Sequence, residues 1–197
     1  MDQAILARHG ESVYSARALM NGDPSVPVGL TAAGIAQARA LGERLRGKPV
    51  ALAVTSGLGR TIATADEALR GRTVPRLVLA DLNDPDYGVF EGRPLDEYRA
   101  WAAANSSSAS PPGGGESRRA LVTRYVRAFR ALRDRPEGTI LVVAHSLPIA
   151  YALAGREGGA PRPQMPLIEY ATPYRFEADE LAAAADTLER WLGEPGF

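Results

Sequence analysis

Residues 4–12 read Ala4-Ile5-Leu6-Ala7-Arg8-His9-Gly10-Glu11-Ser12, an apolar run that ends abruptly in charged and polar residues. A short apolar run of this kind is typical of a buried strand, which the chain leaves at Arg8. A second apolar run, Thr139-Ile140-Leu141-Val142-Val143-Ala144, ends in the same way at His145. The chain has only these two histidines, so both stand where a predicted strand ends. Because an arginine adjoins one of them, we predict a site for an anion there.

Predicted strands and helices alternate along the whole chain. We predict strands at 2–7, 50–54, 76–79, 139–144 and 167–176, and helices at 31–46, 58–69, 94–104, 117–133, 147–155 and 178–192. This alternation predicts a single α/β domain over residues 1–197, a three-layer α/β/α sandwich with a mainly parallel central sheet. The Ser/Pro/Gly-rich stretch at about 105–116 is expected to be a mobile loop. In such folds ligands bind outside the carboxyl ends of the strands, where both histidines fall.

Composition excludes several classes of protein. The 23 basic and 23 acidic residues give a formal net charge of zero, which argues against nucleic acid or an acidic membrane as a partner. The absence of cysteine excludes disulfides and thiolate metal sites. No apolar run approaches the roughly 18 residues of a membrane helix, and no signal-peptide pattern precedes the first strand. We therefore expect a cytoplasmic protein, and we expect the arginines of the helix at 117–133 to form a solvated face.

Four side chains could form one anion pocket. Gly10 allows the chain to curl after the first strand, so that Arg8 and His9 can reach the same space. A neutral imidazole is a competent nucleophile toward phosphorus, and a guanidinium offers planar paired donors to phosphoryl oxygens. Arg60 stands in the first turn of a helix after the second strand, and His145 ends the fourth. An Arg-His pair alone is more often a surface or capping feature, but two arginines and two histidines from three strand ends favour a phosphate pocket. Such a pocket repels cations, so we expect no metal and no cofactor.

Six segments, in order, carry a resemblance to a known family. They are Arg8-His9-Gly10-Glu11-Ser12, Gly29 to Ala38, the Ser-x-Leu-x-Arg-x-x-x-Thr-Ala run at 56–65, Asp86 to Gly92, Pro112 to Ser117, and Val142-Val143-Ala144-His145. Together they resemble the histidine phosphatase superfamily, also called phosphoglycerate mutase-like. The resemblance implies that His9 is the nucleophile that becomes phosphohistidine, and that Arg8, Arg60 and His145 hold phosphate oxygens. For Glu116 and Ser117 we favour helix capping over catalysis.

The chain departs from the family pattern at the proton donor. The family has a glutamate two residues before the Asp86-Tyr87-Gly88 element, and here Asp84 stands in its place. We expect Asp84 to be the general acid, with Asp86 and Glu11 as alternatives. Two further differences lie near the phosphate, where Ser15 replaces a frequent asparagine and Ser146 replaces a glycine. Both serines can still donate hydrogen bonds to phosphate.

The resemblance leaves three functions open. We favour a metal-independent phosphatase acting on small phosphomonoesters, because family mutases usually carry a longer insertion than the stretch at 92–116. A phosphoglycerate mutase-type phosphomutase is the first alternative, and a non-catalytic module that binds phosphorylated ligands is the second. The substrate and the oligomeric state do not follow from the sequence.

Overall fold

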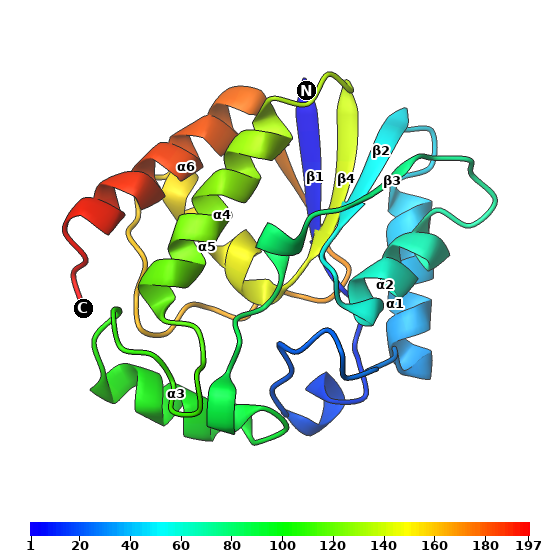
Figure 1. The fold of residues 1–197 in the computed structure, drawn as a ribbon. Coiled ribbons are helices and arrows are strands. Elements are labelled where there is room, and N and C mark those ends of the chain that lie inside the picture. Colours follow the sequence, from blue (N-terminus) through cyan, green and yellow to red (C-terminus); the bar gives the residue numbers. More distant parts are fainter.

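The computed structural model describes all 197 residues and confirms the predicted α/β architecture (Figure 1). The strands are β1 (Gln3–Arg8), β2 (Val50–Thr55), β3 (Arg76–Val78), β4 (Thr139–Ala144) and β5 (Pro173–Glu177). The helices are α1 (Ala32–Arg44), α2 (Gly59–Ala68), α3 (Leu95–Ala104), α4 (Arg118–Arg133), α5 (Ser146–Arg156) and α6 (Ala178–Gly193). Three short 3₁₀ turns lie at Ser15–Arg17, Ala80–Leu82 and Gly88–Phe90. The predicted strands and helices are therefore all present, within a few residues at most ends.

The five strands form one sheet in the order β3-β2-β4-β1-β5. β1 pairs in parallel with β4, and β2 pairs in parallel with both β3 and β4, whereas β5 runs antiparallel to β1. The register places Arg8 opposite Ala144, so both histidines follow directly from neighbouring strand ends. The predicted fifth strand at 167–176 is too long at its start. The backbone of Ala171 is left-handed, with φ at 47°, and this interrupts the extended run before Pro173.

Two cores cover the two faces of the sheet. One face packs against α1 and α2 through alternate β1 residues such as Ile5 and Ala7. The other face packs against α4, α5 and α6 through Ala4 and Leu6. This alternation along β1 follows from the two-residue period of a strand. Because helices enclose both faces, only the carboxyl edge of the parallel strands is left for a ligand.

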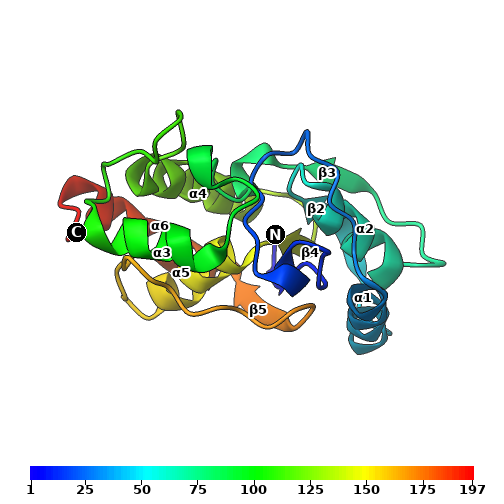
Figure 2. The same ribbon diagram turned by 90° about the horizontal axis from the view of Figure 1, so that it is seen from below.

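A third, smaller cluster of buried side chains includes residues of α3, the helix that lies below that edge in Figure 1 and is seen from below in Figure 2. It joins α3 to the preceding 3₁₀ turn and to the loop after β1, through Met20, Tyr87, Phe90, Tyr98 and Ala102. The stretch at 105–116 packs beside it, with Val89 donating to the Pro112 carbonyl at 2.8 Å and Glu116 to the Asp86 carbonyl at 2.8 Å. Mobility of this stretch stays a prediction. None of the helices has the length and apolar character that crossing a membrane requires.

Gly34 allows α1 to pack closely against the backbone of Glu11, just after His9. This close approach leads to a prediction about stability. A Cβ atom at Gly34 would lie 2.0 Å from the carbonyl oxygen of Glu11, which is backbone and cannot turn away. Gly→Ala inside a helix normally stabilises by about 0.5–1 kcal/mol, but here we expect Gly34→Ala to destabilise by about 1–3 kcal/mol. Urea unfolding measures the difference. Gly193→Ala at the end of α6, where a Cβ meets nothing within 4 Å, is the control, and equal behaviour of the two variants would contradict the prediction.

Candidate active site

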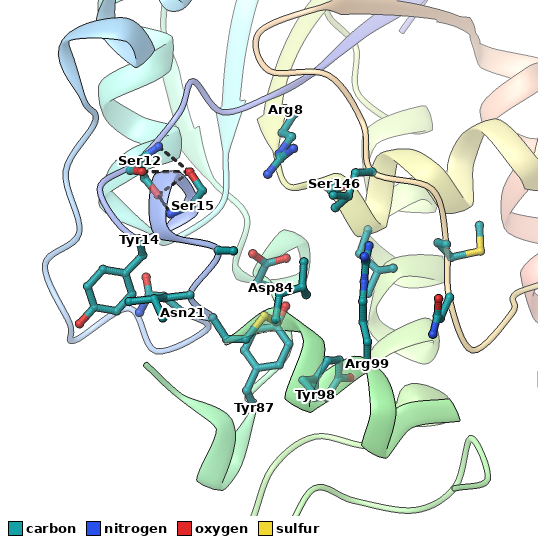
Figure 3. A pocket seen from close by; sticks show the side chains of 18 of the residues that line it. Arg8, Ser12, Tyr14, Ser15, Asn21, Asp84, Tyr87, Tyr98, Arg99 and Ser146 are labelled. Carbon is teal, nitrogen blue, oxygen red and sulfur yellow. Dashed lines mark hydrogen bonds between the residues drawn. The ribbon is translucent and has the colours of Figure 1, made fainter. Parts of the chain in front are cut away.

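A cavity of about 320 Å³ opens at the carboxyl edge of the sheet (Figure 3). Six of the seven residues predicted for the site line it: Arg8, His9, Ser15, Arg60, Asp84 and Ser146. The seventh, His145, is fully buried directly behind Asp84 and Arg60. The structure therefore brings all seven predicted residues together. The volume is at the small end of the roughly 300–1,000 Å³ typical of ligand pockets, which suits a small molecule.

His9 is held with one ring nitrogen toward the backbone and the other toward the pocket cations. Its Nδ1 lies 2.7 Å from the carbonyl oxygen of Gly10, so Nδ1 carries the hydrogen and Nε2 carries the lone pair. Gly10 is fixed in turn, because its N–H donates to the Thr64 hydroxyl at 3.0 Å. Burial lowers the pKa of His9 well below its usual value, and the nearby Arg60, His145 and Arg8 lower it further. The imidazole is therefore neutral, as a nucleophile must be.

Arg60 is the centre of the site and is only 4% exposed. Its Nε donates to His9 Nε2 at 3.1 Å, and its Nη1 donates to the Asn21 side-chain oxygen at 2.6 Å. Its Nη2 donates to Asp84 Oδ2 at 2.8 Å and lies 3.2 Å from His145 Nδ1. The first turn of α2 thus delivers a guanidinium that contacts both histidines and the Asp84 carboxylate.

The Asp84 carboxylate contacts the same side chains, Arg60 and His145, that were predicted to hold phosphate oxygens. Besides Arg60, its Oδ2 lies 3.1 Å from His145 Nδ1. Burial raises the pKa of Asp84, but His145 and Arg60 outweigh burial and hold the pKa well below its usual range. The Asp84 side chain is therefore an anion in this arrangement. Burial lowers the pKa of His145 to about 4 despite the opposing effect of Asp84, and its Nε2 lies 2.8 Å from the Ser56 hydroxyl.

Arg8 enters the cavity from the end of β1. Its Nη1 donates to the carbonyl of Ile168 at 2.7 Å, and its guanidinium lies 3.9 Å from the centre of the Tyr170 ring. Its buried Nε–H has no hydrogen-bond partner. Ser146 holds the same residue, Ile168, because the Ser146 hydroxyl accepts from the Ile168 N–H at 2.8 Å. The residues predicted as the start of the fifth strand thus hold Arg8 in place.

Ser15 and the two alternative acids differ in their access to the cavity. The Ser15 hydroxyl lies 3.0 Å from that of Ser12 and accepts from the Ser12 N–H at 2.7 Å (Figure 3). Glu11 accepts from the Thr31 hydroxyl at 2.7 Å, and Asp86 accepts from the Gly88 N–H at 2.8 Å. Neither Glu11 nor Asp86 lines the cavity, whereas Asp84 does. The geometry therefore favours Asp84 among the three.

The arginines of α4 are not one solvated face, so that prediction was wrong for two of them. Arg124 forms a paired contact with Glu116, at 2.8 Å through both Nε and Nη2. It also donates to the backbone carbonyls of Asp81, Asn83 and Asp84 at 2.7–3.0 Å, and so anchors the chain that carries the candidate acid. Arg118 is 8% exposed and lines the cavity. The other four, Arg119, Arg127, Arg130 and Arg133, keep exposed or half-exposed side chains.

Ser117 caps α4 as predicted, whereas Glu116 does not. The Ser117 hydroxyl accepts from the Ala120 N–H at 3.2 Å, as a helix N-cap does. Glu116 does not line the cavity and is paired with Arg124. Its role in the structure is to hold Arg124 against the loop before Asp84.

Most of the other cavity residues were missed by sequence reasoning, among them Asn21 and two arginines. Asn21 lies in a loop without periodic pattern, and its side-chain and backbone oxygens both accept from Arg60. Arg99 comes from α3, and Arg118 is the first residue of α4. Arg118 stands three residues before the buried Leu121 and seven before Tyr125, so the apolar stripe of α4 already placed it inward.

Comparison with known proteins identifies the family of the chain. Residues 4–180 match the model of the histidine phosphatase superfamily (branch 1). The chain is 32% identical over 154 residues to a protein of Klebsiella pneumoniae named "Probable phosphoglycerate mutase GpmB", an alignment that covers 75% of this chain and 71% of that protein. Among solved structures, Bacillus stearothermophilus YhfR superposes with a TM-score of 0.76 at 27% identity, covering 89% of this chain and 90% of that one. The alpha-ribazole phosphatase from Shigella flexneri superposes with a TM-score of 0.74 at 26% identity, covering 88% and 89%.

Proposed function

The chain belongs to branch 1 of the histidine phosphatase superfamily, and on that premise we propose that it hydrolyses small phosphomonoesters through a phosphohistidine at His9. The observation that carries the proposal is the orientation of the His9 ring. Its Nδ1 is committed to the Gly10 carbonyl, and its Nε2 lone pair meets Arg60 at the floor of the cavity. A phosphoryl group held by Arg60 would therefore lie against the nucleophilic nitrogen.

In the first step Nε2 of His9 attacks phosphorus and a nitrogen–phosphorus bond forms. The bond from phosphorus to the ester oxygen breaks, and the leaving alcohol takes a proton from the carboxylic acid of Asp84. Arg8, Arg60 and His145 hold the three remaining phosphoryl oxygens, where charge is concentrated in the transition state. The orphaned Nε–H of Arg8 and the five donors of each guanidinium suit this task.

In the second step water attacks the phosphohistidine. The Asp84 carboxylate takes a proton from that water, the nitrogen–phosphorus bond breaks, and inorganic phosphate leaves with His9 neutral again. Asp84 is thus protonated again while the product phosphate is still bound. The positive charge needed in both steps comes from side chains of the chain itself.

The protonation of Asp84 has to change when substrate binds. Without an anion in the pocket, Asp84 is ionised and paired with Arg60 and His145. A phosphate dianion would compete for both partners and would repel the carboxylate, and each effect raises the pKa of Asp84. Substrate binding therefore favours the acid form that the first step requires.

Trapping the intermediate tests the proposal. The protein is mixed with p-nitrophenyl phosphate and quenched in alkali, where the nitrogen–phosphorus bond survives, and its peptides are analysed by mass spectrometry. We expect the phosphoryl mass on the peptide that contains His9 and not on the one that contains His145, the other histidine of the chain. Release of phosphate with neither peptide labelled would contradict a covalent intermediate.

Phosphomutase activity is the second candidate, because the Klebsiella relative carries a mutase name. The same phosphohistidine would then return its phosphoryl group to a second hydroxyl instead of to water. Incubation with 3-phosphoglycerate, followed by phosphorus NMR, separates the two outcomes. We expect inorganic phosphate to accumulate, and 2-phosphoglycerate without inorganic phosphate would favour the mutase.

A further inference from the structure

Ser56 carries a buried hydroxyl that the proposed chemistry leaves without a role. It is the first residue after β2 and opens the Ser-x-Leu-x-Arg run, but it is fully buried and does not line the cavity. Because β2 and β4 are parallel neighbours, with Thr55 opposite Val143, Ser56 lies beside the end of β4 (Figure 1). Its Oγ is 2.8 Å from Nε2 of His145. Either atom can be the donor, so this hydrogen bond has one of two directions.

The other ring nitrogen of His145 decides that direction. Its Nδ1 lies 3.1 Å from Asp84 Oδ2 and 3.2 Å from Arg60 Nη2. Nη2 carries two hydrogens, which are accepted by Asp84 Oδ2 and by the Asn21 carbonyl, each at 2.8 Å. Arg60 therefore has no hydrogen left for Nδ1, and an ionised carboxylate can only accept. It follows that Nδ1 carries a hydrogen and donates it to Asp84.

The Nε2 atom of His145 consequently holds a lone pair. Burial lowers the pKa of His145 to about 4 although Asp84 opposes the shift, so at neutral pH the ring is uncharged and has a single hydrogen. With that hydrogen on Nδ1, Nε2 can only accept. The Ser56 hydroxyl is therefore the donor in the contact with His145.

The start of α2 supports Ser56 in this orientation. The Leu58 N–H donates to the Ser56 Oγ at 3.3 Å, and the Thr61 hydroxyl lies 2.9 Å from the same atom. Both belong to the turn that delivers Arg60. One turn of helix therefore places the Arg60 guanidinium beside Nδ1 of His145 and supports the hydroxyl that donates to Nε2.

Resting on the proposed phosphate site at His9, we propose that Ser56 is a positioning residue whose hydroxyl fixes the hydrogen of His145 on Nδ1 and so directs an N–H at the bound phosphoryl group. When a phosphate displaces the Asp84 carboxylate, this N–H is left to donate to a phosphoryl oxygen. The opposite tautomer would turn a lone pair toward the anion and repel it.

The two histidines then carry their hydrogen on the same ring atom for opposite purposes. In His9 the Gly10 carbonyl accepts from Nδ1, which leaves the Nε2 lone pair for attack on phosphorus. In His145 the Ser56 hydroxyl donates to Nε2, which leaves the Nδ1 hydrogen for binding. The partner on the buried side of each ring sets the role of the nitrogen on the other side.

Nuclear magnetic resonance of the two imidazoles tests the tautomer without any turnover. The protein is isotope-labelled at its histidine nitrogens, and correlations with the carbon-bound ring hydrogens distinguish a nitrogen that bears hydrogen from one that bears a lone pair. His9 and His145 are the only histidines, so His9→Ala leaves a single ring to assign. Near neutral pH we expect hydrogen on Nδ1 of His145 and a lone pair on Nε2. Hydrogen on Nε2, alone or together with Nδ1, would overturn the proposal.

A double-mutant cycle tests whether Ser56 acts through His145. Calorimetric titration measures the Kd of inorganic phosphate for wild type, Ser56→Ala, His145→Ala and the double variant. We expect Ser56→Ala to weaken binding by about tenfold when His145 is present, the scale of one charge-assisted hydrogen bond, and by less than about twofold when it is absent. No loss with His145 present, or an equal loss in both backgrounds, would overturn the proposal.

Thr61→Val is the matched control for the cycle. It removes the neighbouring buried hydroxyl and keeps the shape of the side chain, but leaves the Ser56 hydrogen for Nε2 of His145. The phosphate Kd should stay within about twofold of wild type, and a loss as large as that of Ser56→Ala would count against the proposal. If Ser56→Ala does not fold, Ser56→Cys takes its place in the cycle, because a thiol fills similar space and is a weaker donor.

The outcomes for Ser56 and for the phosphatase proposal are separate, because neither measurement needs hydrolysis. The expected tautomer and a non-additive cycle, with no ester hydrolysed, would support the positioning role while the phosphatase proposal fails. Hydrolysis that depends on His9, together with an additive cycle, would support the phosphatase proposal and overturn the role of Ser56.

Discussion

His9→Ala is expected to lower kcat/KM for p-nitrophenyl phosphate by about 10⁴-fold or more, because the variant has no atom that can form the covalent intermediate. His145 cannot take over the attack. It is fully buried, and its two ring nitrogens already face Ser56 and the Asp84–Arg60 pair. The residual rate should reflect only the cations that hold the phosphoryl group.

The same variant separates a lost nucleophile from a lost fold. Arg8 and Arg60 remain in His9→Ala, so inorganic phosphate should still bind the native state of this variant. A ligand that binds the native state and not the unfolded chain raises the melting temperature, and we expect phosphate to do so here. If wild type and His9→Ala hydrolyse the ester equally poorly while phosphate stabilises both, the chain is a binding module. That result would overturn the proposed phosphatase.

Asp84→Asn is expected to have two effects of opposite direction. Turnover of an alkyl phosphate should fall by about 10²-fold or more, because the poor leaving group needs the lost proton. The loss should be smaller with p-nitrophenyl phosphate, whose leaving group departs as an anion. Affinity for inorganic phosphate should rise by about tenfold, because the asparagine no longer competes as an anion for Arg60 and His145.

A matched control for this variant is Asp86→Asn. Asp86 is two residues away and lies outside the cavity, where it accepts from the Gly88 N–H, so neither effect should appear. Initial rates with the two esters and product inhibition by phosphate measure both quantities. Full activity of Asp84→Asn with an alkyl phosphate would show that another group is the acid.

The sequence predicted those parts of the site that are fixed by strand ends. Arg8, His9 and His145 follow β1 and β4, which are parallel neighbours, and parallel strands bring their carboxyl ends to one edge. Arg60 was predicted for the related reason that it opens the helix after β2. For these residues the local sequence pattern and the sheet topology agree. A single sequence, without any comparison to relatives, is therefore enough to place them.

The parts that were missed depend on packing between segments far apart in the chain. Asn21 reaches Arg60 only because the loop after β1 folds back over α2. Arg124 was assigned to solvent by its charge, but three backbone carbonyls from the loop at 81–84 meet it. Composition predicts where a charge is usually found, and it gives no information on which distant carbonyls will satisfy that charge.

The small cluster below the sheet has a consequence for how this protein can evolve. Met20, Tyr87, Phe90, Tyr98 and Ala102 form a core of their own, separate from the two that hold the sheet and the nucleophile. Part of the cavity wall and the strand that leads to His9 therefore belong to separately packed parts of the chain. We expect that substitutions within this small cluster can reshape the cavity in descendants of this gene, while the inherited scaffold that carries His9 stays intact.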